Sequence, residues 1–177
     1  YEFVWRPAPG GVDLDVVVDF TGPWSPTPYR ALDIVLPRLG LLFQLPGGYD
    51  AVEWFGRGPG ETYADSAAGS RIGAWRSSID DLQVPYPVPQ ENGNHLDTRR
   101  LRVTGDELPT LEVQGHPDFA FAARRWTSLD LQRARFPHQL SDSGSVWLNI
   151  DPAQAGLGSA SVGPALPDAH RIALVRT

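Results

Sequence analysis

The sequence contains no cysteine, no methionine and no lysine. The lack of cysteine excludes disulfide bonds and thiolate chemistry. All 15 basic residues are arginines, scattered along a chain whose net charge is −6. A nucleic-acid-binding protein normally concentrates basic residues on one face, so nucleic acid is not an expected partner. The lack of methionine, in a chain that opens with Tyr1, predicts that the sequence is a fragment of a longer polypeptide.

Long apolar runs are missing as well. A membrane-spanning helix needs about 18 to 20 consecutive apolar residues. The longest apolar stretch here, 36–45, is interrupted by Pro37, Arg38, Gly40 and Gln44. No charged segment followed by an apolar one indicates a signal peptide. We therefore expect no membrane partner and a cytoplasmic location. With 177 residues the chain is long enough for one domain with a hydrophobic core.

What the sequence does contain is a pattern of short strands. Apolar residues alternate with aspartates in 12–20, which is typical of a half-buried antiparallel strand. Further alternations occur at 100–103, 111–113, 119–121, 129–131, 146–150 and 172–175. Turn signals rich in glycine, proline or asparagine occur at 9–11, 46–48, 58–60, 92–93 and 105–106. Many short strands with frequent turns predict an all-β fold, an antiparallel β-sandwich that forms a single domain over 1–177.

Helix signals are few. The segment 78–82 predicts one helical turn with Ser78 as its cap. The proline-rich segment 22–28 predicts a surface loop that exposes Trp24. Trp54 and Trp147 stand in strand patterns, so we expect both to be buried.

Three segments carry the most information about function. They are 52–65 (VEWFGRGPGETYAD), 84–99 (VPYPVPQENGNHLDTR) and 146–158 (VWLNIDPAQAGLG). In this order they resemble motifs in the small-chain domain of the large, multidomain β-galactosidases. The resemblance extends over essentially the whole chain. The sequence departs from the family pattern at Ser66 and His95, where the family usually has arginine, and at 159–163.

The resemblance implies a large antiparallel supersandwich similar to that of galactose mutarotases, of which this chain is an incomplete C-terminal portion. It also implies that the sandwich packs on a catalytic barrel holding both carboxylates that hydrolyse terminal β-D-galactosides. The isolated chain is then inactive, has no catalytic residue and meets the galactoside only as part of its parent. The resemblance further implies magnesium and sodium for the parent, with no cofactor assigned to this chain.

One loop of the family's sandwich presents a tryptophan to the sugar, and the resemblance places that position at Gly115. Glycine has no ring on which a sugar can stack. Either the neighbouring His116 substitutes in part as a sugar contact, or the alignment is shifted here, or the protein reads its substrate differently. The structural alternative for His116 is a loop histidine with no contact to sugar.

Glu91 and Asn92 are the other candidate substrate-proximal residues, because they lie in a dense polar loop. The alternative is structural. Asn92 and Gly93 form a strong turn signal, and Glu91 then binds backbone donors or pairs with Arg99.

Glycoside hydrolysis needs two carboxyl groups that flank the scissile bond. None of the 21 acidic residues stands in a context that marks it as acid or nucleophile. Glu61 and Asp65 are better explained as loop carboxylates that bind backbone N–H groups. The four histidines lack metal-ligand spacing, so no metal site is expected.

Two other function classes remain open. A stand-alone carbohydrate-binding module requires an exposed row of aromatic side chains on one sheet face. A mutarotase-like epimerase requires a general acid and a general base on opposite sides of a hexose, and His95 with Glu91 is the only candidate pair. Because truncation leaves sheet edges and apolar surface uncovered, we also expect self-association, most simply as a dimer.

Overall fold

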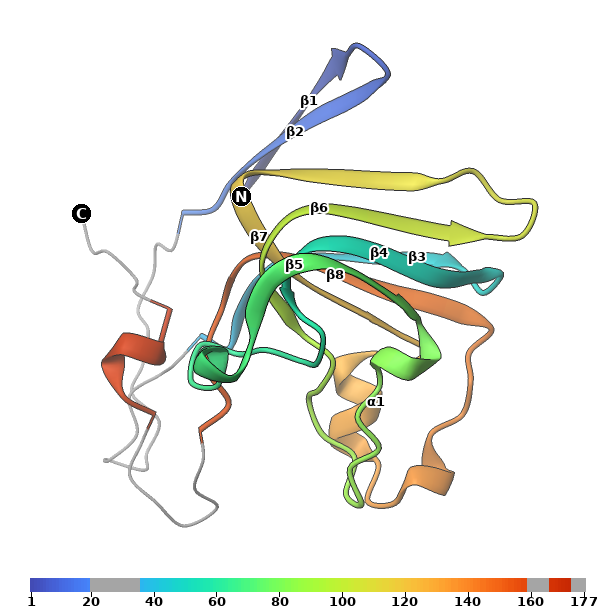
Figure 1. Ribbon diagram of the computed structural model, residues 1–177, viewed down its shortest axis with the longest axis vertical. Coiled ribbons are helices and arrows are strands. Elements are labelled where there is room, and N and C mark those ends of the chain that lie inside the picture. Colours follow the sequence, from blue (N-terminus) through green and yellow to red (C-terminus); the bar gives the residue numbers. More distant parts are fainter. Residues whose placement is uncertain (20–35, 159–165, 173–177) are drawn as a thin grey trace. The chain divides into compact units, whose positions relative to one another are not determined.

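The computed structural model describes residues 1–19, 36–158 and 166–172 (Figure 1). The expected loop at 22–28 and most of the expected strand at 172–175 lie outside these residues. The chain divides into two units, 1–34 and 35–177, which are described separately. The strands in both units pair antiparallel.

The first unit contains a two-stranded hairpin, β1 (Glu2–Ala8) and β2 (Gly11–Val17). Gly10 forms the turn with φ of +82°, a backbone conformation that favours glycine. Trp5 lies opposite Leu14, so the apolar side chains of both strands share one face. The predicted strand is confirmed, but its half-burial is not, since Trp5 and Val12 are 58% and 63% exposed. A two-stranded sheet has no second layer of its own to cover that face.

The second unit is built on one six-stranded sheet. Its strands are β3 (Arg38–Pro46), β4 (Tyr49–Gly58), β5 (Arg71–Ser78), β6 (His95–Gly105), β7 (Leu111–Arg124) and β8 (Ser145–Gln154). They lie in the order β3-β8-β7-β6-β4-β5. The alternations expected around 101, 112, 120 and 148 all fall in these strands, and the turn signals at 46–48 and 105–106 connect them.

The sheet bends over its own core. Val52 and Trp54 of β4 share one buried cluster with Val146 and Leu148 of β8, although β6 and β7 lie between those strands in the sheet. The bend coincides with register shifts in the β6–β7 pairing. The expected antiparallel β-sandwich fold is confirmed. Trp54 is buried as expected, whereas Trp147 is only half-buried.

One expected strand is wrong. Residues 129–131 lie in a helix, α1 (Ser128–Arg133), not in a strand. Thr127 and Asp130 form a capping box at its start, in which the two side chains bind two backbone N–H groups. This capping stabilises a helix where the alternation of apolar and polar residues had predicted a strand. The predicted turn at 78–82 is a short 3₁₀ helix, η2 (Asp80–Leu82), and the Ser78 hydroxyl accepts a hydrogen bond from the Asp81 N–H. Three more 3₁₀ turns in the described residues are η1 (Ala67–Gly69), η3 (Pro137–Gln139) and η4 (Asp168–His170).

Gly40 provides a test of this packing. A Cβ atom at this position would lie 2.0 Å from Oδ1 of Asp151 and 2.5 Å from the carbonyl oxygen of Ile150. We expect Gly40→Ala to lower the free energy of unfolding by about 2 kcal/mol, because β3 must move away from β8. The matched control is Gly60→Ala, whose Cβ meets no atom within 4 Å; it should change stability by less than about 0.5 kcal/mol. Urea unfolding of both variants measures the difference, and equal stabilities would contradict the packing.

Candidate functional site

The first two sequence motifs meet through hydrogen bonds between their loops. Glu61, in the loop after β4, accepts a hydrogen bond from the backbone N–H of Gly93 at 2.7 Å and another from the Tyr86 hydroxyl. Thr62 and Asn94 are joined twice, by Thr62 N–H to Asn94 C=O at 2.6 Å and by Asn94 Nδ2 to Thr62 C=O at 2.8 Å. Loop 59–66 and loop 84–94 are therefore joined by several hydrogen bonds.

The third motif is attached to the first through Asp65. Its carboxylate accepts hydrogen bonds from the backbone N–H groups of Leu157 at 3.2 Å and Gly158 at 2.7 Å. A side chain at Gly156 would press on this carboxylate, since a Cβ there lies 2.7 Å from Cγ of Asp65. The expectation that Glu61 and Asp65 bind backbone N–H groups is confirmed.

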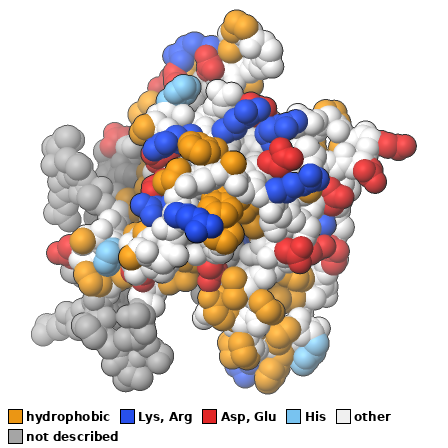
Figure 2. Space-filling model, in the orientation of Figure 1, with side chains coloured by type: hydrophobic (Ala, Val, Ile, Leu, Met, Phe, Trp, Pro, Cys, Tyr) orange, Lys and Arg blue, Asp and Glu red, His pale blue; other side chains and the backbone are white. Residues whose placement is uncertain are grey.

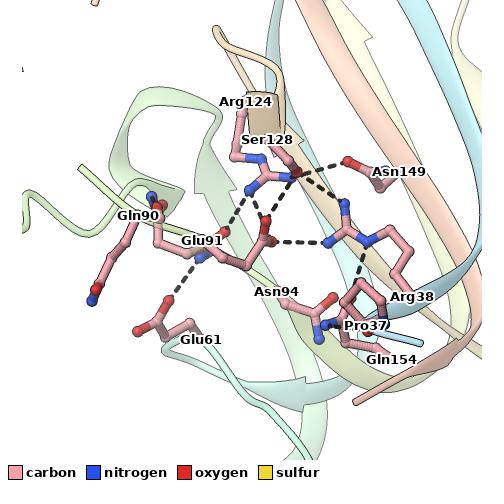
Figure 3. Close-up of polar contacts among 12 residues, drawn as sticks. Pro37, Arg38, Glu61, Gln90, Glu91, Asn94, Arg124, Ser128, Asn149 and Gln154 are labelled. Carbon is pink, nitrogen blue, oxygen red and sulfur yellow. Dashed lines mark hydrogen bonds and ion pairs between the residues drawn. The ribbon is translucent and has the colours of Figure 1, made fainter. Parts of the chain in front are cut away.

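The centre of the site is a network of four charged side chains, namely Arg38 of β3, Arg124 of β7, Asp151 of β8 and Glu91 of the loop before β6. Figure 3 shows Glu91 between Arg38 and Arg124. Arg124 is fully buried, and its guanidinium donates to Glu91 at 2.9 Å and to Asn149 Oδ1 at 3.1 Å. Arg38 donates to the same Glu91 carboxylate at 2.8 Å and lies 3.1 Å from the buried carboxylate of Asp151. Two arginines and two carboxyl groups thus lie together, with Arg124 and Asp151 fully buried and Arg38 and Glu91 partly exposed.

Burial and the two arginines have opposite effects on the carboxylates. Burial alone would raise the pKa of Glu91, but the charges of Arg124 and Arg38 outweigh it, and the pKa of Glu91 is lowered. Asp151 lies deeper, and burial raises its pKa to about 7 despite the neighbouring Arg38. Glu91 is therefore held as a carboxylate ion and is a poor proton donor.

The side chain of Asn92 is hydrogen-bonded to the backbone of its own loop. Its side chain accepts a hydrogen bond from the Val84 N–H at 3.3 Å and donates to the Gln90 carbonyl at 2.9 Å, which closes the loop on itself. The following Gly93 has φ of +72°, as the turn signal indicated. The predicted ion pair between Glu91 and Arg99 is wrong. Glu91 forms ion pairs with Arg38 and Arg124 instead.

His95 lies on the other face of the sheet from Glu91. Its ring stacks on Phe121, with centroids 5.0 Å apart, and lies 4.6 Å from the ring of Trp54. Phe121 and Arg124 belong to a stretch of β7 that pairs without interruption with β8, and their odd spacing directs them to opposite faces. His95 packs on Phe121 and Glu91 binds Arg124, so the pair considered for epimerase chemistry is separated by the sheet.

Gly115 and His116 lie in β7 at the bend, before Phe119, whereas Glu91 contacts Arg124 at the end of the strand. A Cβ at Gly115 would lie 2.6 Å from Cδ1 of Phe119 and 3.0 Å from the backbone of Asp118. A side chain at this position would therefore press on Phe119 and on the backbone of Asp118. His116 is exposed. The four candidate residues form two separate groups.

A pocket of about 360 Å³ lies beside the bend. Its lining includes three carboxylates, those of Asp97, Asp118 and Asp151. Sequence reasoning missed Asp118 and Asp151, and also Arg38 and Arg124. Only their partners in space reveal them, since Arg38 and Glu91 are far apart in the sequence.

No cluster of three or more His, Cys, Asp or Glu side chains in residues 1–19, 36–158 and 166–172 is arranged to hold a metal ion. In the same residues no helix is long and apolar enough to cross a membrane.

Arg124 is expected to be the most sensitive position of the network. Arg124→Met leaves the Glu91 carboxylate and the Asn149 amide without their shared donor, so we expect a loss of about 3 kcal/mol in the free energy of unfolding. The control is Arg133→Met, which removes an exposed arginine of α1 and should cost less than about 0.5 kcal/mol. Guanidinium titration compares the two, and a loss no larger than that of the control would show that the network contributes little.

His95 should make stability depend on pH. Burial lowers its pKa to about 4, so between that pH and its ordinary value of about 6.5 only the unfolded chain binds the proton. Stability due to a neutral His95 is complete above about pH 6.5 and falls as the pH drops toward 4, by about 3 kcal/mol in all.

The variant His95→Phe keeps an aromatic ring in the stack but cannot titrate. The unfolding free energy of wild type minus that of the variant should fall by about 3 kcal/mol from pH 7 to 4, when measured by denaturant titration at each pH. Parallel pH profiles would contradict a buried neutral histidine.

Comparison with known proteins is consistent with these motifs. A family model described as beta galactosidase small chain matches residues 1–176. A β-galactosidase of Arthrobacter sp. (strain B7) is 37% identical over 77% of this chain, and one of Vibrio cholerae is 37% identical over 70%. A β-galactosidase of Kluyveromyces lactis is 33% identical over 91% of the chain.

The matched region is a small part of each relative, namely 14%, 11% and 15% of their respective lengths. Sequence identity above 30% over most of the chain, together with the end-to-end match, agrees with the three motif loops and the antiparallel sandwich. The chain belongs to the β-galactosidase small-chain family.

Proposed function

We propose that this chain is the non-catalytic β-sandwich part of a larger β-galactosidase, in which it packs on the catalytic barrel and forms one wall of the galactoside site. The observation that carries the proposal is the family match over residues 1–176, in relatives of which the chain spans 11 to 15%. The proton donor and the nucleophile are supplied by the barrel.

The contacts of the carboxylates in the sequence motifs support a non-catalytic role for this chain. Glu61 and Asp65 are hydrogen-bonded to backbone N–H groups, and Glu91 is held between two arginines. A general acid must release its proton and a nucleophile must reach the sugar. Carboxylates engaged in this way organise loops and are poorly suited to either task.

The two alternative functions have less support. The epimerase needs His95 and Glu91 on one site, but they lie on opposite faces of the sheet. The binding module needs a row of exposed aromatic side chains. In the second unit, the outer face of β4, β5 and β6 carries one exposed aromatic side chain, Phe55, among charged ones. The exposed Phe3 and Trp5 belong to the two-stranded hairpin.

His116 is the proposed contribution to the substrate wall. It is exposed at the bend of β7, next to Asp118 and the acidic pocket. An imidazole offers one donor and one acceptor to sugar hydroxyl groups. Because Gly115 has no side chain, the backbone next to His116 can lie close to the Phe119 ring. Magnesium and sodium, a cytoplasmic location and self-association through exposed hairpin residues such as Trp5 remain predictions.

Two kinetic measurements test the proposal. The isolated 177-residue chain should not hydrolyse o-nitrophenyl β-galactoside. In the polypeptide that carries this chain together with its barrel, His116→Ala should raise KM about fivefold with a smaller change in kcat, because a hydrogen bond to bound sugar is lost. His138→Ala, at another exposed histidine, should leave both constants unchanged.

Two results would refute parts of this proposal. Hydrolysis by the isolated chain, abolished by replacing one of its own Asp or Glu residues, would place catalysis within the chain. An unchanged KM in His116→Ala would remove this residue from the substrate wall but leave the family assignment intact.

A further inference from the structure

A shallow groove of about 380 Å³ crosses the outer face of β4, β5 and β6, away from the charge network. Its lining is Glu53, Trp54, Phe55, Ala74, Trp75, Arg76, Arg100 and Arg102. Figure 2 shows arginine side chains gathered around apolar side chains over these strands. Phe55 is 41% exposed within this surface, which we call the arginine groove.

The arginine groove differs in charge from the rest of the protein. Strand pairing brings Arg76, Arg100 and Arg102 to its walls, and Arg99 lies 5.8 Å from the centre of the Phe55 ring. The acidic side chains beside these four arginines are Glu53 and Glu112. The chain as a whole has a net charge of −6. Arginines that are scattered in the sequence thus form a basic face on an acidic protein.

The arginines keep donor capacity for a ligand. Arg100 donates to Glu112 through Nε and one terminal nitrogen, but its side chain is 54% exposed. Arg76 lies 3.9 Å from Glu53, too far for a hydrogen bond, and is 73% exposed. Each guanidinium has five N–H donors, so the existing ion pairs leave several free to bind an anion.

The spacing of the arginines along β6 matches that of acidic side chains on an extended polypeptide. Arg100 and Arg102 stand at alternate positions of β6, so their side chains leave the same face about 7 Å apart. Carboxylates at alternate positions of an extended segment repeat at the same interval. Exposed arginines around an aromatic ring are also the composition that distinguishes protein interfaces from other surfaces.

We propose that the arginine groove binds an extended acidic polypeptide segment, whose alternate carboxylates pair with Arg100 and Arg102 along β6 and which places a further carboxylate on Arg76, across β4 from Arg102. Phe55 provides the apolar floor. The interval of about 7 Å along β6 is that of alternate side chains in an extended polypeptide, which is why a polypeptide is the proposed occupant. This inference does not depend on the proposed galactosidase function.

The probe is a blocked hexapeptide of alternating glutamate and threonine, titrated into the 177-residue chain at about 50 mM NaCl and followed by NMR shifts of the strand amides. We expect shifts confined to β4, β5 and β6. A hexapeptide with lysine in place of glutamate should not bind.

Matched double variants locate the site. Arg76→Gln with Arg100→Gln should weaken binding about tenfold, because two charge contacts are lost. Arg133→Gln with Arg135→Gln removes the same charge from exposed positions elsewhere and should leave the affinity within about twofold. Circular dichroism shows whether each variant is folded.

Three results would overturn the proposal. They are an absence of binding at low salt, an equal loss of affinity in both double variants, and tighter binding of an oligothymidylate than of the acidic peptide.

Discussion

The burial of the Arg124 guanidinium is the constraint on which the loop end of this sandwich depends. A fully buried cation must be paired, because leaving it without partners costs several kcal/mol. Glu91 and Asn149 supply the acceptors, and Glu91 in turn binds Arg38. The Ser128 hydroxyl of α1 accepts a hydrogen bond from Arg124 at 3.0 Å and donates one to Glu91 at 2.9 Å. A loop, a helix and three strands are therefore joined by a few charge-assisted hydrogen bonds.

This arrangement explains why polar motifs that suggest catalysis serve structure here. Glu61, Asp65 and Glu91 each satisfy donors that the loops would otherwise leave unpaired, and buried unpaired donors are costly. Such roles demand specific residue types just as strictly as chemistry does. A motif of carboxylates and amides is therefore no evidence for an active site until its partners are known. In this chain the partners are the backbone and two arginines.

Local patterns predicted most of the sheet, because period-two alternation reports directly on which side chains a strand buries. Leu101, Phe121 and Leu148 are all fully buried, as their alternation indicated. The alternation at 129–131 failed because the Thr127 capping box determines that segment. Partners of Glu91 were beyond prediction, since the pairing of β3 with β8 brings Arg38 to it from a distant part of the chain. His95 was misjudged for a similar reason, because only the fold shows which sheet face it occupies.

The bend in β7 connects these observations to function. β7 pairs with β6 on both sides of the bend, up to Gln114 beside the arginine groove and again at Phe119 and Phe121, and from Ala120 it also pairs with β8. Gly115 and His116 lie in the register shift between Gln114 and Phe119, where the ladder is interrupted. Glycine allows the close contact with Phe119 that makes the bend possible, and the same contact leaves no room for a tryptophan. In the proposed substrate wall, this stretch of β7 offers the polar groups of His116 and Asp118 in place of a ring on which a sugar could stack.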